Sequence, residues 1–188
     1  MTNQEILNKA SMEYINLSEE IKKMIVSAKR EKDEKEILSN LDILLQIMLM
    51  YVAVSNYEVE DIELSFIKLV KTECDIITCY NEKNDKHLTW DDLKSDSMEA
   101  SEFKEFVDRC YKMFSSNINY FIIFLASIDS QTKIDELEYV REHIYNIMSY
   151  FSSLTNFNKE VCDYVMDEIF INKYKNTKSI FEKVSFNL

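Results

Sequence analysis

Two short acidic turns carry the residues of this sequence that could do chemistry. Each turn follows an apolar segment, and each has an Ala, then an Asn or Asp three residues later, then a Glu seven residues beyond that. The matched positions are Ala53 and Ala126, Asn56 and Asp129, and Glu63 and Glu136. Carboxylate and amide oxygens are the ligands that Ca²⁺ and Mg²⁺ prefer. If the two turns face one another, Glu63, Asp129 and Glu136 would form a divalent-metal site, with Asn56 as a neutral ligand.

Helix capping is the simpler interpretation of the same pattern. An Asn or Asp side chain accepts hydrogen bonds from backbone amides at a turn and so caps the helix that follows. A Glu in the first turn of a helix is stabilised by the helix dipole. Because capping alone explains the pattern, we expect no cofactor, and a Ca²⁺ or Mg²⁺ site is the alternative.

Cysteine and histidine indicate no further site. The four cysteines lie in apolar segments without a CxxC pair: Cys74, Cys79, Cys110 and Cys162. We expect them to be small buried side chains of a protein in a reducing compartment. Neither His87 nor His143 stands at a zinc-ligand spacing from a cysteine, and His143 should lie at a helix surface or boundary. No serine, cysteine or histidine arrangement is typical of a catalytic dyad or triad, so we expect no enzyme.

Glycine and proline are both absent from the 188 residues. Without glycine, the tight turns and bulges that need positive φ are disfavoured, and so are the phosphate-binding loops of nucleotide-binding proteins. Apolar residues make up 46% of the chain, which is enough for a packed core in one domain. We therefore predict an all-α protein, a single compact helical bundle of about seven helices.

Hydrophobic periodicity divides the chain into helical segments. The first should extend from Thr2, which forms a capping box with Glu5, to about Arg30. The second is apolar on nearly every side, so it should be the central helix of the core. The helices expected after the first cover 37–53, 60–80, 98–114, 118–128, 134–151 and 157 onward.

Polar segments mark the breaks between these helices. Asn81 to His87 should be the main loop, and Thr89 and Asp92 should cap a short turn around Trp90. Residues 115–117 are expected to kink a longer helix, and residues 154–158 to form a further hinge.

The N-terminal helix has a regular apolar seam. Its members alternate in steps of three and four: Leu7, Ala10, Tyr14, Leu17, Ile21, Met24 and Ala28. So short a heptad pattern favours packing within the helix's own bundle, and an intermolecular coiled coil is the alternative. We expect a monomer or weak homodimer. The single domain should comprise an N-terminal amphipathic helix in 1–30, a core in 38–154 and C-terminal helices in 157–188.

The net charge of −12 at pH 7 would repel both the phosphate backbone of nucleic acids and anionic lipids. It favours a protein partner that carries basic charge. The longest apolar runs, Leu41–Val54 and Ile118–Ile128, are too short to span a bilayer, and no signal-peptide pattern follows Met1. We therefore expect a cytoplasmic protein with no membrane span that binds another protein and no nucleic acid.

The two units that carry the acidic turns resemble those of the tellurite-resistance TerB-like family. They are Val52–Glu63 and Leu125–Glu136, and the resemblance covers roughly residues 38–154. The family is an all-helical bundle in which acidic residues of the two units have been considered a divalent-cation site. Here Asn56-Tyr57 and Asp129-Ser130 stand where the family usually has Asp-Gly, so both glycines and one carboxylate are missing.

The resemblance implies a non-catalytic interaction or regulatory module of a bacterial stress-response or defence system. Such modules act beside protein partners, such as an ATPase or another effector. Two alternatives belong to other classes of function. One is a divalent-metal sensor that uses Glu63, Asp129 and Glu136, and the other is a structural oligomerisation domain that pairs through its N-terminal helix.

Overall fold

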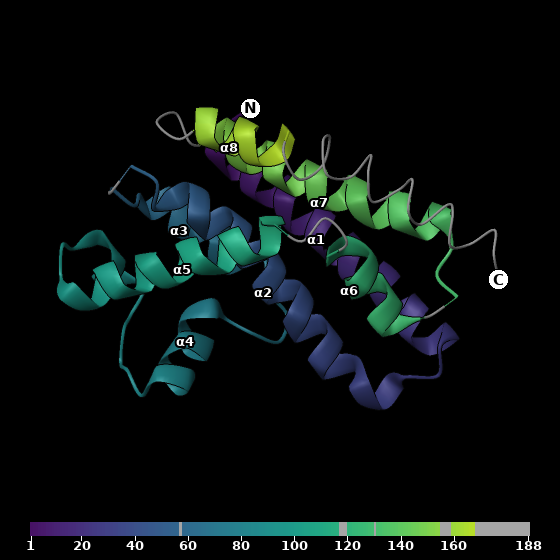
Figure 1. Ribbon diagram of the computed structural model, residues 1–188. Coiled ribbons are helices and arrows are strands. Elements are labelled where there is room, and N and C mark those ends of the chain that lie inside the picture. The colour runs from purple at the N-terminus through teal and green to yellow at the C-terminus, as the bar shows by residue number, and fades with distance from the viewer. Residues whose placement is uncertain (57, 117–119, 130, 155–158, 168–188) are drawn as a thin grey trace.

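The computed structural model describes residues 1–56, 58–116, 120–129, 131–154 and 159–167 (Figure 1). These residues form eight α-helices, two short 3₁₀ helices and no strand, so the all-α prediction is confirmed. The helices are α1 (Asn3–Ser27), α2 (Glu34–Ala53), α3 (Asp61–Leu69), α4 (Ile76–Asn84), α5 (Met98–Ser116), α6 (Tyr120–Ile128), α7 (Ile134–Leu154) and α8 (Lys159–Met166), with η1 (Glu31–Asp33) and η2 (Asp91–Lys94).

Helix α2 is the centre of the bundle, as its composition predicts. It contacts α1, α3, α4, α5, α7 and α8, and most of its residues are buried. The buried set includes two polar side chains, Asp42 and Gln46, which have no exposed surface. A helix that is apolar on nearly every side must be covered on every side, and six neighbours achieve this.

Helices α1 and α7 form the most extensive helix pair and lie side by side in Figure 1. The predicted seam of α1 is buried or half-buried against the bundle, and Leu17 and Ile21 have no exposed surface. The Thr2–Glu5 capping box is also confirmed, with the Glu5 amide 3.2 Å from Thr2 Oγ1. The apolar side of α1 therefore belongs to the core of this chain.

The single helix expected over 60–80 is wrong, because the structure has two helices with a connection at residues 70–75. Asp75 begins the second helix by accepting hydrogen bonds from the amides of Ile77 and Thr78. The carboxylate of Asp42 accepts further bonds from amides of the connection itself. These bonds to side chains replace the intrahelical bonds that a continuous helix would have made.

The loop expected over Asn81–His87 is partly wrong, because α4 continues to Asn84. The chain then turns at Asp85, whose φ of 52° is in the left-handed region. Lys29, after α1, has a φ of 55°. Lys29 and Asp85 thus adopt the left-handed conformation that glycine usually adopts after a helix.

The predicted turn around Trp90 is confirmed by the structure. Thr89 and Asp92 form a reciprocal cap around Trp90, with the Thr89 amide 2.7 Å from Asp92 Oδ2. Helix α5 continues through Ser115 and Ser116, two of the three residues of the expected kink, while the third lies outside the described residues and α6 begins at Tyr120. The expected hinge at 154–158 starts at the last residue of α7, and its other residues and the continuation of the last helix beyond 167 lie outside the described residues.

One helical stretch, residues 31–53, is long and apolar enough to cross a membrane by length and composition alone. Of its most apolar window, 67% is buried inside the protein, and this stretch contains the central helix α2. The core helix of a folded bundle passes the same test, so the expectation of no membrane span remains a prediction.

Candidate functional site

The two acidic turns have the same local geometry. Asn56 Oδ1 accepts from the amide two residues on at 3.2 Å, and Asp129 Oδ1 does the same at 2.8 Å. Glu63 accepts from the Glu60 amide at 2.9 Å, and Glu136 accepts from the Lys133 amide at 2.7 Å. Each Glu therefore occupies the third position of its helix and bonds back to the residue that precedes the first turn, as in a capping box.

Glu63 and Glu136 thus have a capping role, whereas Asn56 and Asp129 accept amides inside the turns, several residues before α3 begins at Asp61 and α7 at Ile134. Glu63 is buried, whereas Asn56, Asp129 and Glu136 are half-buried. Among the described residues, no three His, Cys, Asp or Glu side chains gather closely enough to hold one metal ion. The capping interpretation is confirmed for Glu63 and Glu136 but is wrong for Asn56 and Asp129, because Glu60 and Lys133 are the residues that precede the first helical turns. The Ca²⁺ or Mg²⁺ site remains a prediction that only a binding measurement tests.

A buried polar network around Asp42 was not expected from the sequence. Asp42 Oδ2 accepts from the amides of Thr72, Glu73 and Cys74 at 3.1, 2.7 and 2.8 Å. Its other oxygen accepts from the hydroxyl of Tyr14, whose pKa is raised by burial and by this hydrogen bond. In the sequence, Asp42 and Gln46 interrupt the apolar run Leu41–Val54, and such interruptions are the signal that marks a buried polar anchor.

Gln46 extends the network one turn along α2. Its amide nitrogen donates to the carbonyls of Val70 and Cys74 at 3.2 and 3.0 Å, and its oxygen accepts from the Ile76 amide at 2.8 Å. Asp42 and Gln46 therefore supply most of the hydrogen bonds that the connection between α3 and α4 lacks internally. This network holds α4 against α2.

The expectation for the cysteines is wrong for two of the four. Cys74 and Cys79 are half-buried and form a disulfide that links the 70–75 connection to α4. Cys162 is fully buried as expected, and Cys110 is a half-buried free thiol. Sequence spacing did not reveal the pair, because a disulfide depends on where two Cβ atoms lie and no local motif specifies that.

Disulfides persist mainly in oxidising compartments, so this bond weighs against the cytoplasmic expectation, which remains a prediction.

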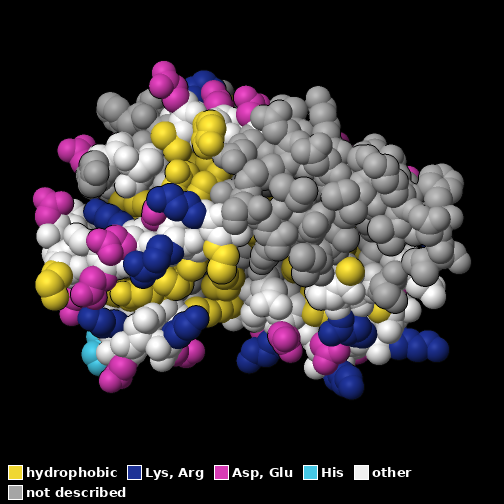
Figure 2. Space-filling model, viewed as in Figure 1, with side chains coloured by type: hydrophobic (Ala, Val, Ile, Leu, Met, Phe, Trp, Pro, Cys, Tyr) yellow, Lys and Arg dark blue, Asp and Glu magenta, His cyan; other side chains and the backbone are white. Residues whose placement is uncertain are grey.

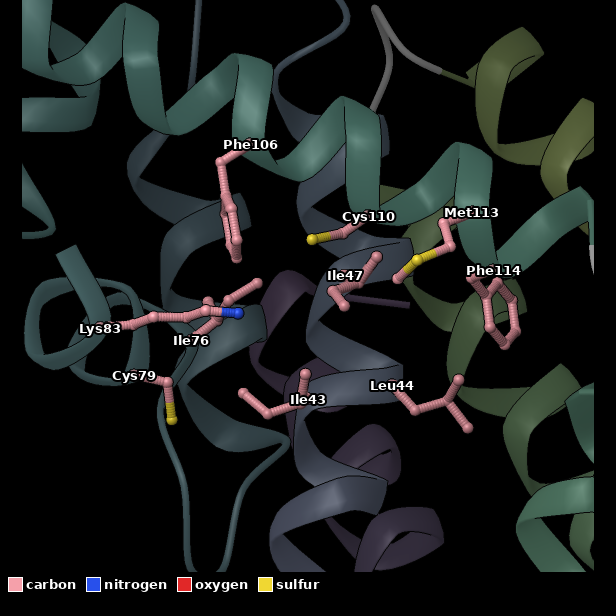
Figure 3. A pocket seen from close by; sticks show the side chains of 10 residues that line it. All are labelled: Ile43, Leu44, Ile47, Ile76, Cys79, Lys83, Phe106, Cys110, Met113 and Phe114. Carbon is pink, nitrogen blue, oxygen red and sulfur yellow. The ribbon is translucent and has the colours of Figure 1, made fainter.

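A groove opens between α2, α4 and α5, and its volume is about 450 Å³. We call it the apolar groove. Its lining residues are Ile43, Leu44, Ile47, Ile76, Cys79, Lys83, Phe106, Cys110, Met113 and Phe114 (Figure 3). Apart from Lys83, every one of these side chains is apolar or sulfur-containing. Volumes of this size and linings of this kind are typical of small-molecule sites.

Space-filling shows a band of hydrophobic side chains along the edge of α5 that faces α4, with Lys and Arg side chains beside it (Figure 2). Met113 lies at the rim of the groove and is 71% exposed. The Asp42 and Gln46 network holds α4 in place, and α4 forms one wall of the apolar groove. The network and the groove are therefore linked through this helix.

Among the described residues, Lys83 is the only charged residue that lines the apolar groove. Its side chain extends from α4 into the groove, beneath the ring of Phe106 (Figure 3). Within the described part of the chain it forms no ion pair, whereas Arg109 on α5 pairs with Glu105 at 3.7 Å. Burial raises the pKa of the Cys110 thiol, while the positive charges of Lys83 and Arg109 partly oppose this. Cys110 is thus a neutral thiol at ordinary pH, poorly suited to nucleophilic attack.

His143 has a structural role at a boundary, as expected. Its Nδ1 lies 2.5 Å from Glu13 Oε2, and its ring packs edge-on against Tyr139. This contact links α7 to α1, and His143 is half-buried.

Comparisons with known proteins provide no relative for this chain: no protein-family model, no curated protein and no solved structure matches it.

Proposed function

We propose that this protein is a non-catalytic binding module and that the apolar groove is its ligand site. The observation that carries the proposal is the cavity of about 450 Å³ between α2, α4 and α5, whose lining is apolar except for Lys83. Concave, mostly apolar surfaces of this volume are typical of sites that bind a ligand. A non-catalytic role agrees with the lining, because its one thiol has a raised pKa and its one cation forms no ion pair among the described residues.

The wider role follows from the resemblance to the TerB-like family. We propose a regulatory module of a bacterial stress-response or defence system that works with a protein partner such as an ATPase. Two findings support this proposal: the two acidic turns share one hydrogen-bond pattern, and the chain has a net charge of −12. The charge favours a partner with a basic surface.

The two other classes of function are less well supported. An oligomerisation domain would need the α1 seam for a second chain, but Leu17 and Ile21 of that seam have no exposed surface. A divalent-metal sensor would need its carboxylates together, and each of them already accepts a backbone amide, Glu63 and Glu136 at a helix start and Asp129 in the turn before α7.

A neutral solvatochromic dye such as Nile red tests the proposed groove, because its fluorescence rises on transfer to an apolar site. We expect saturable binding to the wild type, and loss of binding on Ile47→Glu, which places a charge in the groove wall. Val26→Glu is the matched control, since Val26 is an exposed aliphatic residue on α1 and 57% exposed. Circular dichroism should establish that both variants fold. Absence of saturable binding, or equal loss in both variants, would contradict the proposal.

A further inference from the structure

The chemistry of the lining restricts what the apolar groove can bind. Its walls come from three helices, and backbone groups in the interior of a helix are already hydrogen-bonded to one another. The walls therefore offer hydrocarbon, aromatic and sulfur surface but few free donors or acceptors. A ligand with many polar groups would lose its hydrogen bonds to water without replacement, which costs free energy for each group.

The same argument separates two possible occupants. An extended peptide carries one amide donor and one carbonyl acceptor at nearly every residue, and the groove cannot satisfy them. An intact helix satisfies its own backbone, but its diameter of about 10 Å exceeds what a cavity of about 450 Å³ encloses. An alkyl chain has no such demand and fits a volume in the range of small-molecule sites.

Lys83 adds a requirement for negative charge. The cation projects into the groove from α4 and forms no ion pair within the described residues, whereas Arg109 nearby is paired with Glu105. A carboxylate beside Lys83 would supply the missing partner, while a cationic head group would be repelled. Because the whole chain carries a net charge of −12, long-range attraction of anions is absent. The apolar body of the ligand must therefore provide most of the affinity, and Lys83 sets its orientation.

We infer that the apolar groove binds an aliphatic monocarboxylate, with the alkyl chain between Ile47 on α2 and Phe106 on α5 and the head group at Lys83. This inference rests on the proposed function and names the class of ligand for that site. In the bound ligand, the head group lies at the exposed end of the groove, because Lys83 is itself exposed.

Displacement of Nile red by three probes of equal chain length tests the inference. Dodecanoate, dodecanol and dodecyltrimethylammonium share one alkyl chain and differ in head-group charge. At a pH where dodecanoate is ionised, and below the micelle concentration of each probe, we expect dodecanoate to displace the dye at the lowest concentration. Its advantage over dodecanol should be about fivefold, as expected for an ion pair that keeps contact with solvent.

Substitutions at Lys83 isolate the head-group contact. Lys83→Met should remove the fivefold advantage of dodecanoate and leave the binding of dodecanol and Nile red unchanged. Lys83→Glu should reverse the order, so that dodecyltrimethylammonium becomes the best competitor. Lys9→Met, on the exposed side of α1, is the matched control because it removes one positive charge far from the groove.

The possible results separate this inference from the proposed function. Equal displacement by dodecanoate and dodecanol, unchanged by Lys83→Met, would overturn the inference while the dye still reports a binding groove. Displacement by an acidic amphipathic peptide but by none of the three probes would assign the groove to a protein segment and also overturn it. If the dye itself does not bind, the proposed function fails first.

Discussion

Replacement of Asp42 is the most informative single test of this fold. The carboxylate has no exposed surface and accepts three backbone amides of the connection between α3 and α4, in addition to the hydroxyl of Tyr14. Asp42→Ala would leave those amides without an acceptor in a partly buried position. Asp42→Asn would keep one acceptor oxygen for the amides, but it would remove the negative charge and place an NH₂ donor where the other oxygen accepts from the Tyr14 hydroxyl.

The expected loss of stability follows from the number and type of these bonds. A buried donor left unsatisfied costs about 1 to 3 kcal/mol, and three amides are affected. The connection can rehydrate in part, so we expect Asp42→Ala to lower the free energy of unfolding by about 3 to 5 kcal/mol. Charge-assisted bonds are roughly twice as strong as neutral ones, so Asp42→Asn should cost only about 1 to 2 kcal/mol.

Chemical denaturation and amide hydrogen exchange together measure this effect. Denaturation gives the free energy of unfolding, for which Asn40→Ala on the exposed side of α2 is the control. Exchange should show loss of protection at the amides of Thr72, Glu73 and Cys74 in Asp42→Ala. If that variant stays within about 1 kcal/mol of the wild type and the three amides keep their protection, the anchoring role of Asp42 is refuted.

Three further predictions concern the cysteines and the acidic turns. Because Cys74 and Cys79 form a disulfide, thiol titration of the denatured protein should detect two thiols without reductant and four after reduction, and the double replacement by Ser should cost about 2 kcal/mol. Four thiols without reductant would disprove the bond. Burial raises the pKa of the Cys162 thiol from 9.0 to about 12, so its contribution to stability is complete below pH 9.0 and is lost as the pH rises towards 12. Between about pH 8.5 and about pH 10.5, the loss of stability should therefore be about 2 kcal/mol smaller in Cys162→Ala than in the wild type, and equal slopes would contradict the shift. If Asp129 only stabilises its turn, Asp129→Asn should change stability little, Asp129→Ala should cost about 0.5 to 1.5 kcal/mol, and Ca²⁺ or Mg²⁺ should leave the melting temperature unchanged. A saturable rise with either ion that is abolished by Asp129→Asn would instead support the metal site.

Local features of the sequence were sufficient to predict the architecture. The absence of glycine and proline and the helical spacing of apolar residues predicted an all-α bundle, and the structure confirms it. Caps such as Thr2 with Glu5 were also predictable, because both partners lie within one helical turn and their bond depends on nothing farther away.

Non-local features decided what the sequence could not show. The break between α3 and α4 depends on Asp42 and Gln46, which are about thirty residues earlier and reach the connection only after α2 is buried. The Cys74–Cys79 disulfide likewise depends on how the connection folds back against α4.

The apolar groove is the clearest case of a site that only the tertiary structure reveals. Its walls come from α2, α4 and α5, and the side chains of Ile47, Phe106 and Met113 follow the same helical spacing as residues of the core. Periodicity indicates that such a side chain faces the interior of the bundle, but not whether another helix fills the space in front of it. That depends on the angle at which α4 is held by the Asp42 and Gln46 network. Composition and spacing therefore determined the class of fold, whereas the packing of three helices left the groove open beside Lys83.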